Sequence, residues 1–249
     1  MPQASTTPGS GRSLRRSASA LFVTALLLFA GVGFAVSRSP AQSARVIPPP
    51  VADAMASQTP TETAVFAGGC FWGVQGVFQH VDGVESAVSG YSGGTVVNPD
   101  YHAVTTGTTG HAEAVEIKYD PAKVSYGELL QIFFSVAHNP TELNRQGPDV
   151  GPHYRSAIFP ENAEQARVAK AYIAQLDEAR AFNKPIVTRI EADKIFFPAE
   201  AYHQNYMIRN PTQPYIAIHD LPKIEDLKRI FPGAYRAEPV LVATAAKSK

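Results

Sequence analysis

The chain is poor in the residues that cross-link or give a dominant charge: it has one cysteine, one tryptophan and no net charge over 249 residues. A single cysteine excludes a disulfide within the chain and a metal site built on several cysteines. Since 22 Lys and Arg balance 22 Asp and Glu, no strong field attracts nucleic acid. With 45% hydrophobic residues, we expect a domain stabilised by its core, with no nucleic-acid partner.

Long apolar runs are also scarce, and the clearest one lies near the N-terminus. Arg12, Arg15 and Arg16 precede the apolar run 20–36, and small residues follow it. A basic segment, an apolar stretch and small residues form the layout of an export signal. The run is shorter than the ~20 residues of a spanning helix but long for a signal, so an uncleaved anchor stays open. We predict an export signal or membrane anchor over 1–37 and, in a bacterial source, a periplasmic domain that meets the membrane only through this segment.

Composition divides the rest of the chain into three parts. Residues 38–60 include three consecutive prolines and lack the apolar pattern of a core, which predicts a flexible linker. Residues 61–236 have the length of one domain, without an internal repeat. Residues 237–249 are rich in Ala, Lys and Ser, which predicts a disordered tail.

Within residues 61–236, the apolar periodicity alternates between that of strands and that of helices. The predicted strands are 63–67, 111–119, 155–159 and 186–196. The predicted helices are one that begins at Phe71, one over 125–137 with a Ser-x-x-Glu capping box at its start, and one over 162–181. Strands and helices in this order predict an α/β two-layer sandwich rather than a bundle or a barrel.

The only cysteine lies in the stretch GGCFWG, Gly68 to Gly73, where a predicted strand runs into a predicted helix. The unpaired N–H groups at a helix start favour negative charge, so a thiol there can have its pKa lowered from ~8.5 and act as a nucleophile. Taken alone, Cys70 is better explained as a small buried hydrophobic residue. The residues around it decide between these two interpretations.

GGCFWG resembles the signature of the A-class peptide methionine sulfoxide reductases, and further blocks resemble that family in its order. These blocks are Gly90–Gly94, Asn98–Tyr101, Gly107–Val115, Asn144–Asp149, Tyr154–Ser156, Phe197–Glu200 and Tyr202–Gln204. The resemblance spans residues 63–206. It implies an α/β (α+β) two-layer sandwich with a ferredoxin-like split βαβ core and extensive loops, and reduction of methionine S-sulfoxide, free or in oxidised proteins. We also expect a monomer.

The resemblance implies catalytic roles for Cys70 and Glu113. Cys70 is the nucleophile, and its thiolate attacks the sulfoxide sulfur. Glu113 resembles the family's catalytic acid, which protonates the sulfoxide oxygen, since an S–O bond cannot release a bare oxide. Donating a proton at neutral pH requires a carboxyl whose pKa is raised by burial. Isolated in a strand, the same glutamate would be an exposed, paired carboxylate.

Five more residues gain roles from the resemblance. Tyr101 and Tyr154 match the tyrosines whose hydroxyls hydrogen-bond the sulfoxide oxygen. Asp149 matches an aspartate that orders the site through hydrogen bonds, and Phe71 and Trp72 would pack on the S-methyl group of the substrate. Without the resemblance, each would be read as a core or turn residue.

The chain departs from the family in two respects. Many members carry further cysteines that resolve the sulfenic acid left on the nucleophile, and this chain has none. We therefore expect no bound cofactor and an external thiol reductant: a thioredoxin-like protein, a glutaredoxin with glutathione, or a small dithiol. His153 stands where the family more often has Gln, and we expect it to point away from the pocket in a strand. The other histidines are scattered, which argues against a metal site.

Three alternatives stay open at this stage. A one-cysteine thiol peroxidase would need neither the methyl-binding aromatics nor Glu113 as an acid. A redox sensor or methionine-binding module would modify Cys70 without turnover, and the lack of a second cysteine favours it. A purely structural extracytoplasmic domain leaves the family order of Cys70, Tyr101, Glu113 and Tyr154 unexplained.

Overall fold

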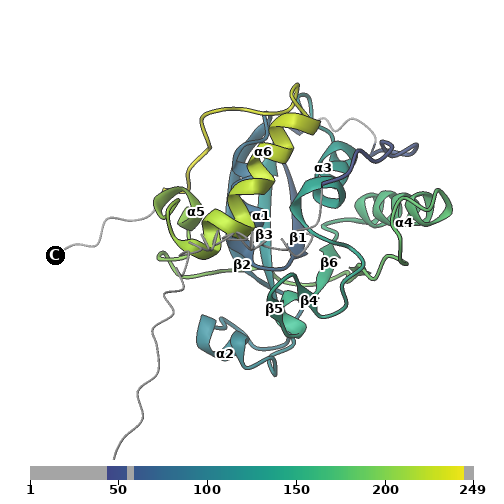
Figure 1. The fold of residues 1–249 in the computed structure, drawn as a ribbon. Helices are drawn as coiled ribbons and strands as arrows, with labels where there is room; N and C mark the ends of the chain where they lie inside the picture. Colours follow the sequence, from purple (N-terminus) through teal and green to yellow (C-terminus); the bar gives the residue numbers. More distant parts are fainter. Residues whose placement is uncertain (1–43, 55–58, 244–249) are drawn as a thin grey trace, which may run out of the picture. The chain divides into compact units, whose positions relative to one another are not determined.

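The computed structural model describes residues 44–54 and 59–243, which belong to one unit, Ser39–Lys249 (Figure 1). The predicted export segment, 1–37, lies outside the described residues, as do residues 38–43 and 55–58 of the predicted linker and 244–249 of the predicted tail. Within the part of the chain that the structure describes, no helix is both long and apolar enough to cross a membrane.

A mainly antiparallel sheet forms the centre of the domain, in the order β7-β6-β1-β3-β2-β8. Antiparallel pairing joins β6 to β1, β1 to β3, β3 to β2 and β2 to β8, whereas β7 pairs parallel with β6. The strands are β1 Glu62–Gly68, β2 Val84–Ser92, β3 Ala112–Tyr119, β6 Ser156–Phe159, β7 Arg189–Ile190 and β8 Phe197–Pro198. A separate hairpin pairs β4 Arg145–Gln146 with β5 Asp149–Val150.

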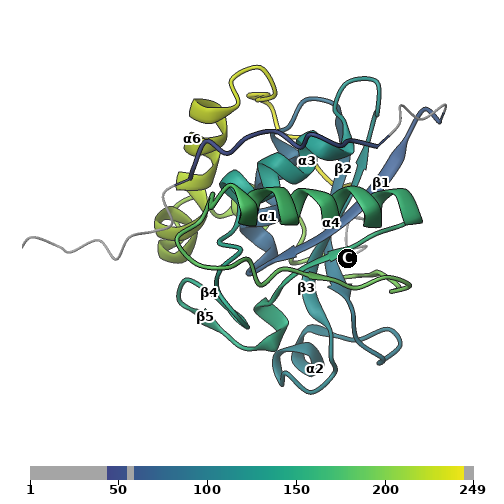
Figure 2. The same cartoon turned by 90° about the vertical axis from the view of Figure 1, so that its right-hand side faces the viewer.

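The helices complete a βαββαβ order, in which α1 joins β1 to β2 and α3 joins β3 to β6. Figures 1 and 2 show α1, α3 and α6 on one side of the sheet. The helices are α1 Phe71–Gln79, α2 Tyr101–Thr105, α3 Tyr126–Ile132, α4 Ala163–Glu178, α5 Tyr206–Arg209 and α6 Leu221–Ile230, with π-helical turns Phe133–Ala137 and Ile216–Asp220 and a 3-10 turn Pro152–Tyr154. The predicted two-layer sandwich with a ferredoxin-like core is confirmed.

Local sequence signals account for where two helices begin. Ser125 Oγ accepts the Glu128 N–H, and the Glu128 carboxylate accepts the Ser125 N–H, so the predicted capping box is present. The π-helical turn then continues α3 through Ala137, where the predicted helix ends. At α4, the Asn162 side chain accepts the Gln165 N–H.

The predicted strand 186–196 is wrong over most of its length, since only Arg189 and Ile190 pair with β6. β6 is four residues long and offers β7 a short edge, and the flanking residues run as loop, half-buried over 186–188 and exposed over 192–195. Ile186 and Ile190 instead pack against the main core and Phe196 against the cluster on the second face, whereas Ile195 is 70% exposed. The alternation reflected packing of a loop and not strand pairing.

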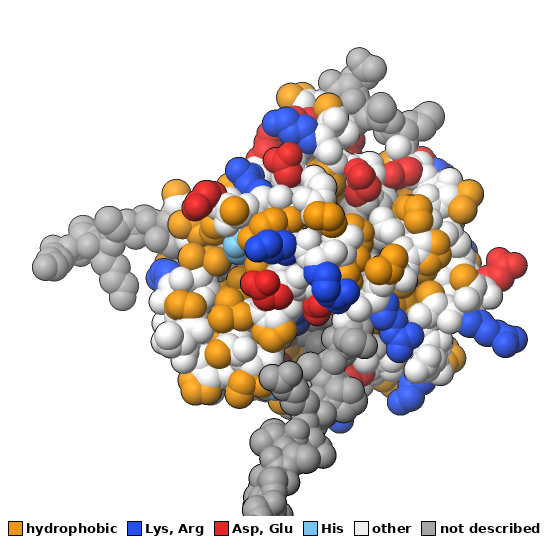
Figure 3. Space-filling view, turned by 45° about the horizontal axis from the view of Figure 1, so that its top comes forward, with side chains coloured by type: hydrophobic (Ala, Val, Ile, Leu, Met, Phe, Trp, Pro, Cys, Tyr) orange, Lys and Arg blue, Asp and Glu red, His pale blue; other side chains and the backbone are white. Residues whose placement is uncertain are grey.

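The two faces of the sheet differ in the size of their side chains. On the helix side, Phe66 stacks on Phe133 at 4.8 Å between ring centroids and packs against Phe78 and Tyr126. The second face holds a smaller cluster of mainly short side chains: Val65, Ala67, Ala112, Ala114, Ala157 and Phe159. On the face shown in Figure 3, acidic and basic side chains are interspersed, in keeping with zero net charge.

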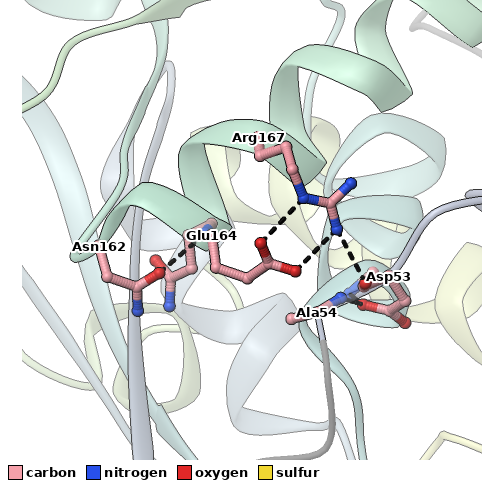
Figure 4. A network of polar contacts seen from close by, with 7 residues as sticks. Asp53, Ala54, Asn162, Glu164 and Arg167 are labelled. Atoms are coloured by element: carbon pink, nitrogen blue, oxygen red, sulfur yellow. Dashed lines mark hydrogen bonds and ion pairs between the residues drawn. The ribbon is translucent and has the colours of Figure 1, made fainter.

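Part of the predicted linker packs against the domain, so the prediction of a flexible tether is wrong for residues 44–54. Ile47 is 3% exposed, and the Tyr172 hydroxyl donates to the Pro48 carbonyl at 2.7 Å. Asp53 accepts hydrogen bonds from Ser125 Oγ and the Gly127 N–H. Figure 4 shows Arg167, which pairs with Glu164, also reaching the Asp53 carbonyl.

The first residues of the predicted tail, 237–243, also contact the domain. Val240 N–H donates to the Gln79 carbonyl at the end of α1. The Asn205 side chain accepts the Val242 N–H at 3.0 Å and donates to the Val242 carbonyl at 2.9 Å. Residues 237–243 are therefore ordered by contacts that the polar composition of the tail does not indicate.

Candidate active site

All seven predicted site residues line one pocket of about 190 Å³ near the start of α1. Residues from α2, β3, β5, the 3-10 turn that follows it and the segment 213–215 form its other walls. The lining residues are Cys70, Phe71, Trp72, Tyr101, Glu113, Asp149, Tyr154, Gln213 and Tyr215. A larger cavity of about 360 Å³ lies between residues 123–128 and 230–234 and has no nucleophilic cysteine or tyrosine hydroxyl in its lining.

Cys70 is the residue that precedes the first turn of α1, and only Gly69 separates it from the end of β1. Gly69 turns the chain there with a φ of +88°, a conformation that a side chain would strain. A Cβ on Gly69 would also come within 2.4 Å of the Gln146 side chain, so only glycine fits. The strand-to-helix junction predicted for Cys70 is confirmed.

The predicted lowering of the Cys70 pKa is wrong for the substrate-free site. Cys70 is partly buried, and desolvation raises the pKa of its thiol well above the usual range. The Glu113 and Asp220 carboxyls raise it further, while a hydrogen bond from the Trp72 backbone N–H acts in the opposite direction. Desolvation and nearby acids outweigh the helix N-terminus, so the resting group is a thiol.

Glu113 projects from β3 into the pocket and is 2% exposed. Its Oε2 accepts the Phe71 N–H at 3.0 Å, at the start of the helix that follows Cys70. Burial raises the pKa of Glu113 to about 8, although the Phe71 hydrogen bond lowers it. The carboxyl is therefore mostly protonated at neutral pH, the state that proton donation requires.

Tyr101 begins α2 and is held there by Glu200. Glu200 Oε1 accepts the Tyr101 N–H at 2.8 Å, and Oε2 accepts the Tyr91 hydroxyl at 2.9 Å. Burial and the Glu113 charge raise the pKa of Tyr101 to about 12, while a hydrogen bond from Tyr154 lowers it. Burial also raises the pKa of Tyr154, so both hydroxyls remain donors at neutral pH.

Asp149 is bound by Tyr215, whose hydroxyl donates to Asp149 Oδ2. Sequence reasoning missed Tyr215 and Gln213, which line the pocket from the C-terminal side. Tyr215 also packs its ring edge on Trp72, and Tyr206 stacks on the same indole at 3.9 Å between centroids. The aromatic residues after the last recognised block were the available signal.

Asp220 is a second residue that the sequence did not single out. It is fully buried at the end of a π-helical turn, and Oδ1 pairs with Lys223 Nζ at 3.3 Å. A Cβ on Gly73 would come within 2.1 Å of Asp220 Oδ1, so the carboxyl lies against the first turn of α1. Its charge raises the pKa of both Cys70 and Glu113.

His153 lies in a 3-10 turn, not in the predicted strand. Its side chain is 7% exposed, and its ring packs against Tyr154 at 4.2 Å between centroids. Pro152 and Gly151, with a φ of +144°, favour this turn over an extended strand. Among the described residues, no group of three or more His, Cys, Asp and Glu side chains could hold a metal ion.

Comparison with known proteins identifies the family. The family model described as peptide methionine sulfoxide reductase matches residues 62–233. Over 185 residues, the chain is 62% identical to peptide methionine sulfoxide reductase MsrA 2 of Mesorhizobium japonicum, covering 74% of this chain and 95% of that protein.

Solved structures are also similar. Methionine sulfoxide reductase A of Corynebacterium diphtheriae has 33% identity and a TM-score of 0.53, over 64% of this chain and 79% of that one. Reduced Mxr1 from Saccharomyces cerevisiae has 26% identity and a TM-score of 0.56, over 67% of this chain and 94% of that one. The chain belongs to the A class of the peptide methionine sulfoxide reductase family and is an enzyme of that family.

Proposed function

We propose that this enzyme reduces methionine S-sulfoxide, free or in oxidised proteins, to methionine with electrons from an external thiol. The observation that carries the proposal is the buried Glu113 carboxyl, which accepts a hydrogen bond from the first residue of the helix that follows Cys70. Each sulfoxide epimer has its own class of enzyme, and the A-class relatives support the S epimer here.

The pocket walls suit the two ends of a methyl sulfoxide. Phe71 and Trp72 provide apolar surface for the S-methyl group, and Tyr101 and Tyr154 provide hydroxyl donors for the sulfoxide oxygen. The Tyr215 hydrogen bond fixes the Asp149 side chain, which supports the wall that these donors share. In this arrangement the substrate sulfur faces Cys70 and its oxygen faces Glu113.

In the chemical step, the Cys70 sulfur attacks the sulfoxide sulfur while Glu113 protonates the oxygen. Overall, one thiol and one sulfoxide yield one methionine and one sulfenic acid on Cys70. The cysteine sulfur loses two electrons and the sulfoxide sulfur gains them. Because the resting group is a thiol, it loses its proton as it attacks, and the Trp72 N–H stabilises the attacking thiolate. The thiol proton replaces the one that Glu113 gives to the oxygen, which leaves as water. Water then attacks the Cys70 sulfur, the S–S bond to the substrate breaks, and methionine and the sulfenic acid are left.

Regeneration requires two thiol groups from outside the chain, since Cys70 is its only cysteine. The first thiol condenses with the sulfenic acid and releases water, which leaves a mixed disulfide on Cys70. A second thiol attacks this disulfide, frees Cys70 and leaves with the first as a disulfide. A thioredoxin-like protein, a glutaredoxin with glutathione, or a small dithiol supplies both groups.

We also propose a cellular location for the enzyme. The basic and apolar N-terminal residues support an export signal or anchor over 1–37, which would place a monomeric domain in the periplasm. Proteins oxidised in that compartment would then be its substrates.

Single-turnover formation of methionine from each sulfoxide epimer, without reductant, tests the proposal on the full chain. We expect one equivalent from the S epimer and continued turnover when dithiothreitol is added. The control, Cys70→Ser, should form none while keeping the circular dichroism of the folded protein. One equivalent of methionine without further turnover would favour the redox-sensor alternative. Methionine formation by Cys70→Ser would refute the role of Cys70 as the nucleophile.

A further inference from the structure

His203 is a buried histidine that packs against residues lining the pocket but does not line it itself, and the reaction described above does not use it. The Trp72 indole Nε1–H donates to His203 Nδ1 at 3.1 Å, and His203 is 2% exposed. An accepting Nδ1 carries no proton, so the neutral ring carries its proton on Nε2. Burial lowers the pKa of His203, which keeps the ring neutral and this acceptor available.

The same imidazole packs against other walls of the pocket. Its ring centroid lies 4.9 Å from that of Phe71 and 4.5 Å from that of Tyr101. It therefore touches both aromatic residues assigned to the methyl group and one of the two hydroxyl donors. Among residues 44–54 and 59–243, its Nδ1 is the one hydrogen-bond acceptor of the Trp72 indole N–H.

The residues after His203 are fixed to the core by buried side-chain amides. Gln204 donates to the Ser89 carbonyl and accepts from the Gln75 side chain at 2.8 Å. The Gln75 side chain in turn accepts the Asn205 N–H at 2.9 Å. Since Gln75 lies on α1, this network joins the segment that carries His203 to the helix that carries Trp72.

We propose that His203 is a positioning residue that fixes the plane of the Trp72 indole and so sets how tightly the pocket holds the methyl sulfoxide group. Tyr206 covers one indole face by stacking, and the His203 hydrogen bond fixes the rotation that stacking alone leaves free. The kinetic part of this inference rests on the proposed function, because it takes Trp72 to contact the substrate. The link between His203 and Trp72 stands on the geometry alone.

Two substitutions separate the hydrogen bond from the volume of the ring. His203→Phe keeps an aromatic ring but leaves the indole N–H without its acceptor, whereas His203→Asn keeps an oxygen near the position of Nδ1. We expect His203→Phe to raise KM for methionine sulfoxide roughly tenfold, the size of effect from one orphaned donor, with little change in kcat. His203→Asn should restore part of the wild-type KM.

The fluorescence of the single tryptophan tests the link without substrate. Trp72 is the only tryptophan in the chain, so emission and acrylamide quenching report on this indole alone. We expect His203→Phe to shift the emission and increase quenching, and His203→Asn to do so less. The matched control is His80→Phe: His80 is also buried, but it lies at the far end of α1 and its Nδ1 meets the Gly76 carbonyl.

The fluorescence of Trp72 and the KM for methionine sulfoxide test different parts of the inference. Unchanged emission and quenching in a folded His203→Phe would overturn the positioning role, whatever the activity of the enzyme. A changed emission with an unchanged KM would refute the kinetic part. If the wild-type chain failed to reduce methionine sulfoxide, the proposed function would fall while the fluorescence result still decided the link. Equal changes in His203→Phe and His80→Phe would mean a structural role only.

Discussion

The Glu113 carboxyl accepts a hydrogen bond from the backbone N–H of Phe71, with 3.0 Å between N and Oε2. Phe71 follows Cys70 directly, so the acid on β3 is tied to the first residue of the helix that the nucleophile precedes. The hydrogen bond therefore fixes the Glu113 carboxyl beside the backbone that carries the nucleophile. This arrangement suits a reaction in which attack and proton transfer must coincide.

Replacing Glu113 by Gln tests the proton donation. The amide oxygen can still accept the Phe71 N–H, but the side chain has no acidic proton to give. We expect single-turnover formation of methionine to slow by ~10²–10⁴, with substrate binding retained. Rapid-quench measurement of methionine gives the rate, and a rate equal to that of the wild type would remove Glu113 from this role.

The buried carboxyl also predicts how stability depends on pH. The pKa of Glu113 is raised from 4.5 to about 8 on folding, so its contribution is fully present below about pH 4.5 and is lost as pH rises through about 8. Glu113→Gln removes this dependence. The free energy of unfolding should therefore fall more for the wild type than for the variant between these pH values, by on the order of a few kcal/mol.

Urea unfolding of both proteins at several pH values measures this difference. Comparing the two proteins cancels the contributions of the other titrating groups, provided that the m-values agree. Parallel stability curves for wild type and variant would mean that folding does not raise the pKa of Glu113.

The sequence could predict the parts of the site that lie in short contiguous motifs. Cys70 and its aromatic neighbours sit in one stretch, and β1, α1 and the capping box of α3 follow local rules of spacing. β2 was not predicted, because serines and glycine interrupt its apolar pattern, and a strand buried between β3 and β8 needs no alternation.

The missed site residues share a different cause. Tyr215 lines the pocket and Asp220 lies against the first turn of α1. Both come from a C-terminal segment whose packing on α1 is a tertiary contact, which no local pattern encodes. The wrong prediction of a lowered Cys70 pKa has the same cause. The sequence indicates the helix N-terminus, but it does not show the burial of the thiol or the nearby carboxyls, which raise the pKa and outweigh the helix.

The segment 44–54 should stabilise the domain through Asp53. The Asp53 carboxylate accepts from Ser125 Oγ and the Gly127 N–H at the start of α3. Asp53→Ala removes these two hydrogen bonds and the one from the Ala54 N–H, and should lower the free energy of unfolding by about 1–2 kcal/mol, as for a lost helix cap. The control is Val51→Ala, since the Val51 side chain in the same segment is exposed.

Urea denaturation followed by circular dichroism distinguishes the two variants, and we expect Val51→Ala to match the wild type. Equal stability of Asp53→Ala and the wild type would mean that the segment lies on the domain without contributing to its stability.

Asp220 should control the proton affinity of Cys70 and Glu113 from beneath the first turn of α1. Its charge raises the pKa of both groups, so Asp220→Asn should lower both. The rate of Cys70 alkylation by iodoacetamide follows the thiolate fraction, and its midpoint should move to lower pH in the variant. Lys223, left without its partner, adds to the shift in the same direction.

The matched control for Asp220 is Asp226→Asn, because Asp226 lies on α6 and pairs with Arg229 three residues away, as Asp220 pairs with Lys223. Asp226 is not among the carboxyls that shift the Cys70 pKa, so its removal should leave the alkylation profile unchanged. Equal profiles for Asp220→Asn and the wild type would mean that the Lys223 ammonium already cancels the Asp220 charge at the sulfur. An equal shift in both variants would assign the effect to the net charge of the helix rather than to the buried carboxyl.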